Sequence, residues 1–471
     1  MLLVCLGYSR VSLAQSRQQI KTDSVLTLIR KYYNNQQADS IYALCGVNFK
    51  KEIGLDAFRG IAFQNLFPMG SIRETALISF LNNKVGKYRV TFNYATLQLM
   101  LSLDQDDKVE LFLFQPYKDE SKAKIKRVAS TNKMLTRMDK QVDIVIRSYI
   151  QKANTVGLSA AVIKNGIVHI YNYGETARGD NQIPTADNLY EIGSITKTFT
   201  ATLLAWYVNK GTVKLNDLIT KFLPDSVSSN KVLGDITLEM LSNHTSGLPR
   251  LPDNLEKTAK DPINPYKDYN KADLFTYLRN CKLNSKPGEQ YAYSNLAVGL
   301  LGVILEKVSG KTYQQMVTEI ICRPLGMKST QQHLAPALVT RMVTVYNEEG
   351  NVTQPWNFNA LAACGALKSS LNDLVIYTKA YMHPAQDQLG KAMQLTRQLT
   401  FNQDVKIGLA WHMIAVNGVA YVFHNGGTYG CSSFIAFNNS NNLAVIALSN
   451  CGESTDATGI ELLKKLQAAA H

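Results

Sequence analysis

Long apolar runs and clustered metal-binding residues are both missing from this 471-residue chain. No run approaches the ~18 apolar residues that a membrane-spanning helix needs, so we predict no transmembrane segment. The sequence also lacks a Cys-x-x-Cys pair and a Cys/His cluster, and we therefore expect no metal and no cofactor. Apart from Cys5, the cysteines are widely scattered, which favours buried free thiols or one disulfide.

Acidic residues are scarcer than basic ones, 37 against 50, which leaves a net charge of +13. The basic excess is concentrated only between residues 118 and 140, where the composition is that of a solvated linker. We therefore predict no nucleic-acid partner, although loose contact with anionic polymers of the cell envelope is compatible with the charge. The length of the chain and its 45% hydrophobic residues predict two globular domains.

Residues 1–14 are interpreted as the remnant of a secretory signal peptide. The apolar run at residues 2–6 is followed by Ser12-Leu13-Ala14, which is typical of a signal-peptidase site. No basic residue precedes the apolar run, so a disordered tail is the alternative. The signal-peptide interpretation predicts a periplasmic or secreted protein.

We predict that residues 21–117 form a small α+β accessory domain, which is followed by a basic linker at 118–137. Two helical patterns precede three alternating, strand-like segments. These elements are expected at 25–43, 55–67, 88–94, 97–103 and 109–114. Two helices followed by a meander resemble cystatin-like or nuclear-transport-factor-like modules, and we expect this domain to bind or orient rather than to catalyse.

Residues 138–471 predict a larger domain in which one sheet is built from both ends of the chain segment. A helix and a hairpin around the turn Lys164-Asn165-Gly166 begin it, and two hairpin-like blocks and a helix end it. The middle is helical and includes one helix that is apolar nearly all round. The expected ranges are 138–153 for the first helix, 273–279 and 295–308 for the middle helices, 408–423 and 433–448 for the hairpins, and 460–470 for the last helix.

Ser194 stands at the beginning of an apolar helix and is the first catalytic candidate. Phe199, Leu203 and Tyr207 recur behind it at helical spacing. The amine of Lys197 therefore shares a helix face with the Ser194 hydroxyl. Unpaired N–H groups in the first turn would stabilise negative charge there. A serine hydroxyl becomes nucleophilic when a nearby base takes its proton, and a lysine with a lowered pKa is such a base.

The Ser-x-x-Lys spacing is a weak signal by itself. It also occurs at Ser121, Ser130 and Ser228, none of which begins a long apolar helix. An N-cap serine followed by a surface lysine is the structural alternative.

A second motif, Tyr293-Ser294-Asn295, lies between a Pro-Gly turn and the apolar helix expected at 295–308. In extended chain, side chains two residues apart share one face, so the Tyr293 phenol and the Asn295 carboxamide would project together into a cleft. An ordinary turn with Asn295 as the helix cap is the alternative.

The third motif, His424-Asn425-Gly426-Gly427, ends an alternating, strand-like segment. Glycines at a strand edge allow another backbone, such as a substrate amide, to approach closely. A half-exposed histidine beside a glycine turn is the alternative.

In this order and with these gaps, the three motifs resemble the active-site signature of the serine penicillin-recognising family, which includes class C β-lactamases, DD-peptidases and related esterases. The resemblance covers about residues 138–471 and extends to the loop His244-Thr245-Ser246-Gly247-Leu248-Pro249. It implies a β-lactamase/transpeptidase-like fold, an antiparallel sheet flanked by helices with a helical subdomain. It also implies a serine hydrolase that acts through an acyl-enzyme.

The resemblance implies a catalytic role for three side chains. Ser194 would attack a carbonyl carbon, and Lys197 and Tyr293 would share the proton transfers. Which of the two accepts the Ser194 proton stays open. The backbone N–H groups of Ser194 and Gly427 would form the oxyanion hole.

On the substrate side, the resemblance implies that Asn295 hydrogen-bonds the substrate amide, with His424 and Gly426 also at the binding site. His424 stands where many family members have the lysine of Lys-Thr-Gly, and Asn425 replaces the threonine. A histidine carries less dependable positive charge at neutral pH than a lysine. We therefore expect a small-molecule or peptide substrate, an ester or a D-amino-acid peptide rather than a β-lactam. The alternative is a penicillin-binding or sensor module that keeps the pocket without turnover.

Overall fold

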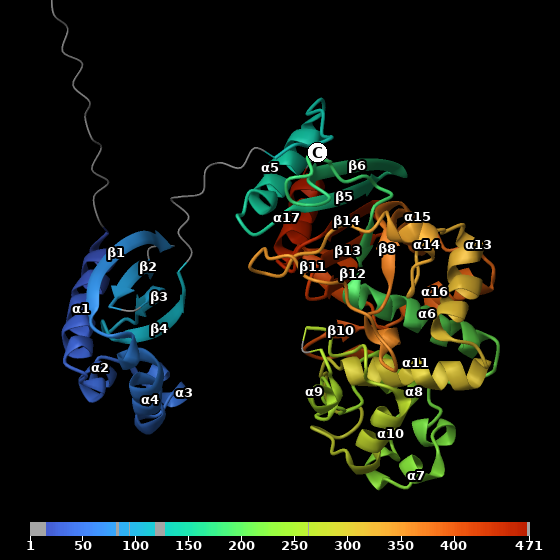
Figure 1. Cartoon of the computed structure of the whole chain (residues 1–471), viewed down its shortest axis with the longest axis horizontal. Helices are drawn as coiled ribbons and strands as arrows, with labels where there is room; N and C mark the ends of the chain where they lie inside the picture. Colours follow the sequence, from blue (N-terminus) through green and yellow to red (C-terminus); the bar gives the residue numbers. More distant parts are fainter. Residues whose placement is uncertain (1–15, 82–83, 94, 118–127, 262, 469–471) are drawn as a thin grey trace, which may run out of the picture. The chain divides into compact units, whose positions relative to one another are not determined.

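The computed structural model describes residues 16–81, 84–93, 95–117, 128–261 and 263–468. The chain divides into two compact units, Met1–Lys124 and Ile125–His471, which are drawn in Figure 1. The predicted signal segment and residues 118–127 of the predicted linker lie outside the described residues. Within the described ranges, no helix combines the length and the apolar character needed to cross a membrane.

The first unit contains helices and a four-stranded antiparallel sheet with the order β1-β2-β3-β4. Its core joins Ile29 and Tyr33 of α1 to Tyr88, Val90 and Leu101 of the sheet. The elements are α1 (Arg17–Asn34), α2 (Ala38–Ala43), α3 (Val47–Glu52), α4 (Leu55–Ile61), η1 (Ala62–Leu66), η2 (Phe67–Met69), β1 (Ile72–Leu81), β2 (Val85–Phe92), β3 (Thr96–Leu103) and β4 (Val109–Pro116).

The strand β1 was not predicted from the sequence, which indicated only three strands. It is an edge strand of which only Ile72 is buried, and its pairing with β2 is interrupted by two irregularities of register. An edge strand with most side chains exposed need not alternate apolar and polar residues, so periodicity does not reveal it.

The second unit is organised around an eight-stranded antiparallel sheet with the order β6-β5-β14-β13-β12-β11-β10-β9. The neighbours β5 and β14 come from opposite ends of the unit, which confirms the predicted sheet built from both ends. The strands are β5 (Gly157–Lys164), β6 (Ile167–Gly174), β9 (Phe401–Asn402), β10 (Lys406–Ile407), β11 (His412–Val416), β12 (Val419–Gly427), β13 (Ser432–Asn438) and β14 (Leu443–Ser449).

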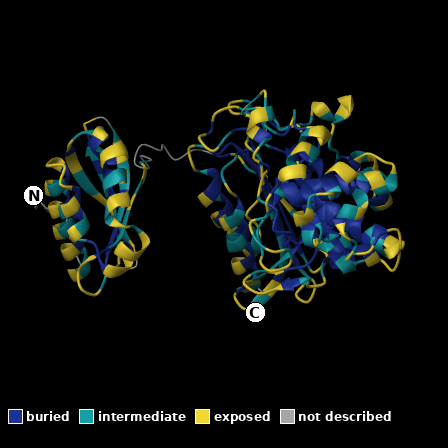
Figure 2. Cartoon of the chain, turned by 90° about the horizontal axis from the view of Figure 1, so that it is seen from below, coloured by how far each residue is buried: buried dark blue, intermediate teal, exposed yellow. Residues whose placement is uncertain are grey.

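Helices cover both faces of this sheet because alternate residues of its central strands are apolar on each side. In β5, Ala160 and Val162 pack with one core, while Ala161 and Ile163 pack with the other. The helices α5 (Arg137–Ile150) and α17 (Asp456–Ala468) cover the first face and lie side by side in Figure 1. The buried helix α6 (Thr196–Asn209) and α15 (Leu371–Met382) belong to the second core, and Figure 2 shows this interior in dark blue.

The helical middle of the unit contains α10 and α11, which confirm the two helices predicted there. The helices α15 and α16 and the short strand pair β7-β8 were not predicted. The helix α15 was missed because it is rich in buried tyrosines and threonine, which are equally typical of strands. The remaining elements are α7 (Asp225–Ser228), α8 (Leu238–Ser242), α9 (Leu255–Thr258), α10 (Lys271–Asn280), α11 (Asn295–Ser309), α12 (Tyr313–Met316), α13 (Arg323–Leu325), α14 (Pro336–Val339), α16 (Gln388–Thr396), β7 (Leu189–Glu191), β8 (Lys368–Ser370), η4 (Gly193–Ile195), η5 (Ile219–Phe222), η6 (Lys231–Leu233), η7 (Val317–Cys322) and η8 (Ala362–Cys364).

Residues 128–136, the described part of the predicted linker before α5, pack on the second unit. The Thr131 N–H donates to the Asn172 carbonyl (3.0 Å), and the Gly174 N–H donates to the Ala129 carbonyl (2.9 Å). Thr136 then caps α5 through a capping box with Asp139. This stretch therefore extends the edge of the sheet beside β6.

Candidate active site

Ser194 lies in the turn that joins the sheet region to the buried helix α6. The strand β7 ends at Glu191, the single turn η4 contains Ser194, and α6 follows at Thr196. Ser194 is partly exposed, whereas every other residue from 191 to 200 is buried. The hydroxyl is therefore presented at the surface of a rigid, packed segment, in a position to meet a substrate.

The Lys197 amine is fully buried and makes contacts that aim it at Ser194. Its Nζ lies 3.0 Å from Ser194 Oγ, 2.8 Å from Asn295 Oδ1 and 2.7 Å from the Cys364 carbonyl oxygen. The amide and carbonyl oxygens only accept hydrogen bonds, so they orient N–H bonds of the amine. The remaining position of the amine faces the Ser194 hydroxyl, where a proton can pass in either direction.

Tyr293 and Asn295 of the second motif both lie beside this amine. Lys197 Nζ lies 4.8 Å from the centre of the Tyr293 ring, and both Tyr293 and Asn295 are partly exposed. The alternative in which Asn295 caps the helix is wrong, because the Ser294 side chain caps α11 by accepting from the Ala297 N–H. Asn295 is thereby left free to contact Lys197.

Tyr266 holds the other end of the Asn295 side chain and was missed by sequence analysis. Asn295 Nδ2 donates to the Tyr266 hydroxyl (3.2 Å), and the Tyr266 ring stacks on Phe358 with ring centres 4.5 Å apart. Tyr266 lies in a proline-punctuated loop with no periodic pattern, so no local signal marks it. Sequence analysis also missed the Cys364 carbonyl, because every residue has a backbone carbonyl and the residue type does not indicate which one accepts a hydrogen bond.

The end of β12 approaches the Ser194 turn at van der Waals distance. A Cβ added to Gly193 would lie 2.7 Å from Gly427 N, and one added to Gly426 would lie 2.2 Å from the Ile192 carbonyl oxygen. Ser433 Oγ also donates to that carbonyl (2.9 Å). The backbone N–H groups of Ser194 and Gly427 are therefore contributed by two touching segments, the arrangement that an oxyanion hole requires.

The Gly426→Ala variant is expected to lower the melting temperature and to disturb the Ser194 turn. Its Cβ would lie 3.0 Å from Ser194 N as well as 2.2 Å from the Ile192 carbonyl oxygen, and neither backbone can retreat freely. Overpacking of this kind costs about 1–3 kcal/mol, or about 1–4 °C in a unit of this size. Calorimetry would measure it. The matched control is Gly427→Ala, whose Cβ would meet nothing within 4 Å; equal melting temperatures for the two variants would contradict the tight contact.

His424 is fully buried rather than half-exposed. Its Nδ1 donates to the Asn425 carbonyl oxygen (2.6 Å), and its Nε2 has no partner among the described residues. Burial, with the neighbouring His412 and Lys197, holds the pKa of His424 well below its usual range. The ring is therefore neutral at pH 7 and supplies no positive charge to the surroundings of Ser194.

His244, in the loop at 244–249, packs against the Tyr293 ring and binds the backbone next to it. Its ring centre lies 4.4 Å from that of Tyr293, and its Nδ1 accepts a hydrogen bond from the Ser294 N–H (3.2 Å). Burial, followed by the charge of Lys197, lowers the pKa of His244 far below 6.5. An imidazole that accepts at Nδ1 is neutral, so the hydrogen bond and the pKa agree.

Glu191 links the strand before the Ser194 turn to the residue after Gly427, a contact that sequence analysis did not foresee although Glu191 lies three positions before Ser194. Its Oε2 accepts from the Thr428 hydroxyl (2.8 Å), and its Oε1 accepts from the Trp356 N–H (2.5 Å). Thr428 directly follows Gly427. Burial raises the pKa of Glu191 to about 7, an effect that the charge of Lys368 opposes.

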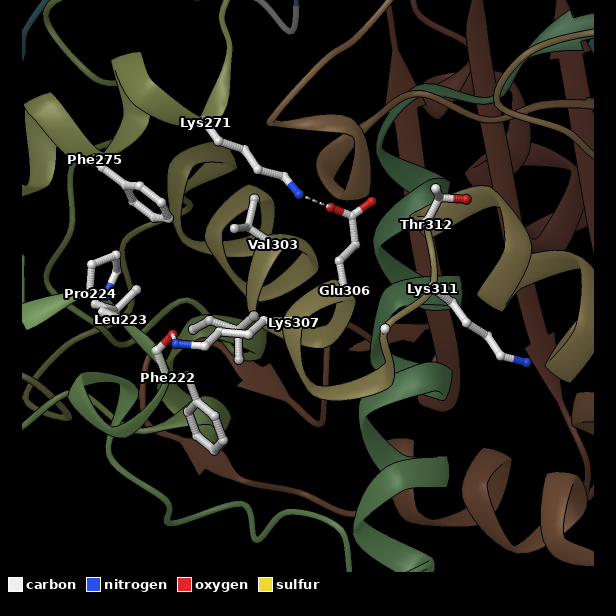
Figure 3. A pocket seen from close by; sticks show the side chains of 12 residues that line it. Phe222, Leu223, Pro224, Lys271, Phe275, Val303, Glu306, Lys307, Lys311 and Thr312 are labelled. Carbon is white, nitrogen blue, oxygen red and sulfur yellow. Dashed lines mark hydrogen bonds and ion pairs between the residues drawn. The ribbon is translucent and has the colours of Figure 1, made fainter.

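Hollows elsewhere on the helical part contain none of these residues. One of about 550 Å³ is lined by Phe222, Phe275 and Val303, and in Figure 3 Lys271 of α10 reaches across it to Glu306 of α11 (2.7 Å). Within the described ranges, no group of His, Cys, Asp and Glu side chains is arranged to hold a metal ion. The six cysteines after Cys5 are all buried free thiols.

Comparisons with known proteins agree with this geometry. The Beta-lactamase family profile matches residues 142–469. A beta-lactamase of Pseudomonas fluorescens is 29% identical over 277 residues, 58% of this chain and 73% of that protein. The D-alanyl-D-alanine-carboxypeptidase/endopeptidase AmpH of Escherichia coli is 36% identical over 233 residues, 49% of this chain and 58% of that protein.

Among solved structures, a beta-lactamase/D-alanine carboxypeptidase of Pseudomonas syringae superposes with a TM-score of 0.63 at 25% identity, over 71% of this chain and 100% of that one. A class C beta-lactamase shares the fold, with a TM-score of 0.63 at 23% identity. These matches confirm the resemblance and the fold that the three motifs predicted. The chain belongs to the beta-lactamase family, and its second unit is a serine hydrolase.

Proposed function

We propose that this protein hydrolyses an ester or a D-amino-acid peptide through an acyl-enzyme at Ser194, in the periplasm or outside the cell. The observation that supports the proposal is the 3.0 Å contact between the buried Lys197 amine and the partly exposed Ser194 hydroxyl. The relative AmpH is named as a D-alanyl-D-alanine carboxypeptidase, which favours the peptide substrate.

In the first half of the reaction, Ser194 Oγ attacks the substrate carbonyl carbon while Lys197 or Tyr293 takes its proton. The negative charge on the former carbonyl oxygen is met by the N–H groups of Ser194 and Gly427, and removing one such donor typically costs about 3 kcal/mol of barrier. The tetrahedral intermediate then collapses. The alcohol or amine leaves with a proton from the same pair of side chains, and the acyl group stays on Ser194.

In the second half, water attacks the acyl-enzyme, its proton passes to Lys197 or Tyr293, and the acid is released with Ser194 restored. Asn295 lies between Lys197 and Tyr266, and one of its two N–H bonds is used by Tyr266. The other N–H bond can donate to a substrate carbonyl. Because His424 is neutral, it offers a β-lactam carboxylate no charge partner, which supports esters and peptides over β-lactams.

Intact-mass analysis after treatment with a fluorophosphonate tests the nucleophile. We expect one adduct per chain, located on Ser194 and absent in Ser194→Ala. A panel of p-nitrophenyl esters, D-alanyl peptides and nitrocefin then ranks the substrates, and we expect turnover of the esters and peptides to exceed that of nitrocefin. A protein that forms no adduct would contradict the proposal. Slow, permanent acylation without product release would favour the binding or sensor alternative.

A further inference from the structure

We propose that Tyr266 is a positioning residue for the reaction, because its hydroxyl fixes the Asn295 carboxamide that holds the Lys197 amine. The inference rests on the proposed function, and it gives a part in the reaction to a phenol that belongs to none of the three sequence motifs. Tyr266 would act through Asn295 and would not contact the reacting atoms.

The Asn295 carboxamide is held at both of its ends. Its Oδ1 accepts from Lys197 Nζ (2.8 Å), and its Nδ2 donates to the Tyr266 hydroxyl (3.2 Å). The last torsion of an asparagine side chain has only broad preferences, so the backbone of α11 does not set the direction of the carboxamide. The amine of Lys197 changes its hydrogen-bonding pattern when it gains or loses a proton. The Tyr266 hydroxyl is therefore the partner that stays the same throughout the reaction.

The Tyr266 hydroxyl keeps its proton. Burial raises the pKa of Tyr266 above its usual value of 10, and the hydrogen bond from Asn295 opposes this effect only in part. The phenol is consequently uncharged at every pH at which the protein is folded and active. It remains an acceptor for the Asn295 N–H group without placing a negative charge beside the Lys197 amine.

An aromatic stack fixes the ring of Tyr266. The ring packs face to face on Phe358, with ring centres 4.5 Å apart and planes inclined by 25°, and its centre lies 5.2 Å from that of Trp356. The backbone carbonyl of Tyr266 also accepts from the Asn359 N–H (3.2 Å). Ring and backbone contacts thus join two loops that are distant in the sequence, which gives the hydroxyl a fixed position.

The same stack reaches the second acceptor of the Lys197 amine, the Cys364 carbonyl. Gly365 directly follows Cys364, and a Cβ added to Gly365 would lie 3.2 Å from the Phe358 ring. The Phe358 ring therefore lies against the backbone next to this carbonyl and also stacks on Tyr266. Of the two acceptors, only the Asn295 carboxamide can turn about side-chain torsions. It alone needs the Tyr266 hydroxyl to stay aimed at the amine.

Tyr266→Phe tests the inference, because it removes the hydroxyl and keeps the ring that stacks on Phe358. We expect the limiting rate of fluorophosphonate labelling to fall about 3- to 10-fold, the usual effect of losing one uncharged hydrogen bond. The half-saturating concentration of the reagent should stay within about twofold of wild type. The matched control is Tyr269→Phe, since Tyr269 is also buried and donates its hydroxyl to an asparagine, Asn254 (2.9 Å), and its labelling rate should equal that of wild type.

A double-mutant cycle with Asn295→Ala separates positioning from a structural effect. In the Asn295→Ala background, Tyr266→Phe should lower the labelling rate less than about twofold, because the hydroxyl has lost the group through which it acts. An equal fall in both backgrounds would overturn the positioning role, and so would a fall of less than about twofold when Asn295 is present.

The side-chain amide signal of Asn295 gives a readout that does not require turnover. In protein labelled with ¹⁵N-asparagine, it is the side-chain signal that disappears in Asn295→Ala. Tyr266→Phe should shift or broaden it and Tyr269→Phe should not; an unchanged signal in Tyr266→Phe would contradict the inference. Failure of the proposed function gives a different pattern: the wild-type protein would neither be labelled at Ser194 nor turn over a substrate, while the Asn295 signal would still respond to Tyr266→Phe.

Discussion

Replacing Lys197 with methionine is expected to lower kcat/KM for a p-nitrophenyl ester by about a thousandfold or more, close to the effect of Ser194→Ala. Methionine keeps the length and apolar stem of lysine, so the packing of α6 is preserved while the amine is lost. The amine is the group that lies 3.0 Å from Ser194 Oγ and is held there by Asn295 and the Cys364 carbonyl. Without it, no other side chain among the described residues lies within hydrogen-bond distance of the Ser194 hydroxyl to exchange a proton with it.

Lys231→Met is the matched control, because Lys231 has the same Ser-x-x-Lys spacing from Ser228 but is exposed. Steady-state kinetics and the rate of fluorophosphonate labelling would be measured for both variants, with circular dichroism to verify folding. Lys231→Met should be indistinguishable from wild type. If Lys197→Met kept more than a tenth of the activity, the Lys197 amine would not be part of the proton transfer, and Tyr293→Phe would become the decisive variant.

Glu191→Gln is expected to lower kcat about 10- to 100-fold with little change in KM, since on the proposed mechanism the carboxylate positions the oxyanion hole and does not contact substrate. Both carboxylate oxygens accept, one from Thr428 Oγ1 and one from the Trp356 N–H. Thr428 Oγ1 in turn accepts from the Gly430 and Cys431 N–H groups (3.3 and 3.0 Å). A glutamine would present an N–H group to one of these donors and break that contact.

The pH dependence provides a signature that a merely structural role would not give. Burial raises the pKa of Glu191 from 4.5 to about 7. Because the ionised form accepts both hydrogen bonds, activity should rise with pH through an apparent pKa near 7, and this limb should be absent in Glu191→Gln. Stability should change in the opposite direction. The pKa of Glu191 is higher in the folded protein than in the unfolded chain. The contribution of Glu191 to the free energy of unfolding is therefore complete below pH 4.5 and is lost as the pH rises through 7.

Kinetic pH profiles and thermal unfolding at pH 5 and pH 8 would measure these two trends, with Glu461→Gln on the surface of α17 as the control. A Glu191→Gln profile that keeps the acidic limb would show that another group controls it. A large rise in KM would contradict the positioning role.

The sequence indicated which side chains gather around Ser194 where short motifs bring them together, and missed those that arrive from distant loops. Ser194, Lys197, Tyr293 and Asn295 lie in short motifs, where local geometry alone brings side chains to one face, and the structure places them together. Tyr266 reaches the same site through long-range packing from a loop, so neither periodicity nor spacing marks it. Its position depends on the fold as a whole.

The same distinction applies to the secondary structure. The hairpin around Asn165 and Gly166 was predicted because asparagine and glycine tolerate the positive φ that a tight turn requires, and in the structure both residues adopt it. The exposed edge strand β1 was missed because it lacks the alternation that burial imposes. The burial of His424 could not be read from the sequence either, since a histidine in an alternating strand is equally compatible with the surface.

The pairing of β5 with β14 has a consequence for biosynthesis. These central strands are separated by the whole helical middle of the unit, so the sheet cannot close until β14 has been made. A growing polypeptide contains Ser194 and Lys197 long before Asn295 and Cys364, which orient the Lys197 amine, and before Gly427, which would complete the proposed oxyanion hole. We therefore expect hydrolytic competence to arise only after nearly all of this unit has been translated.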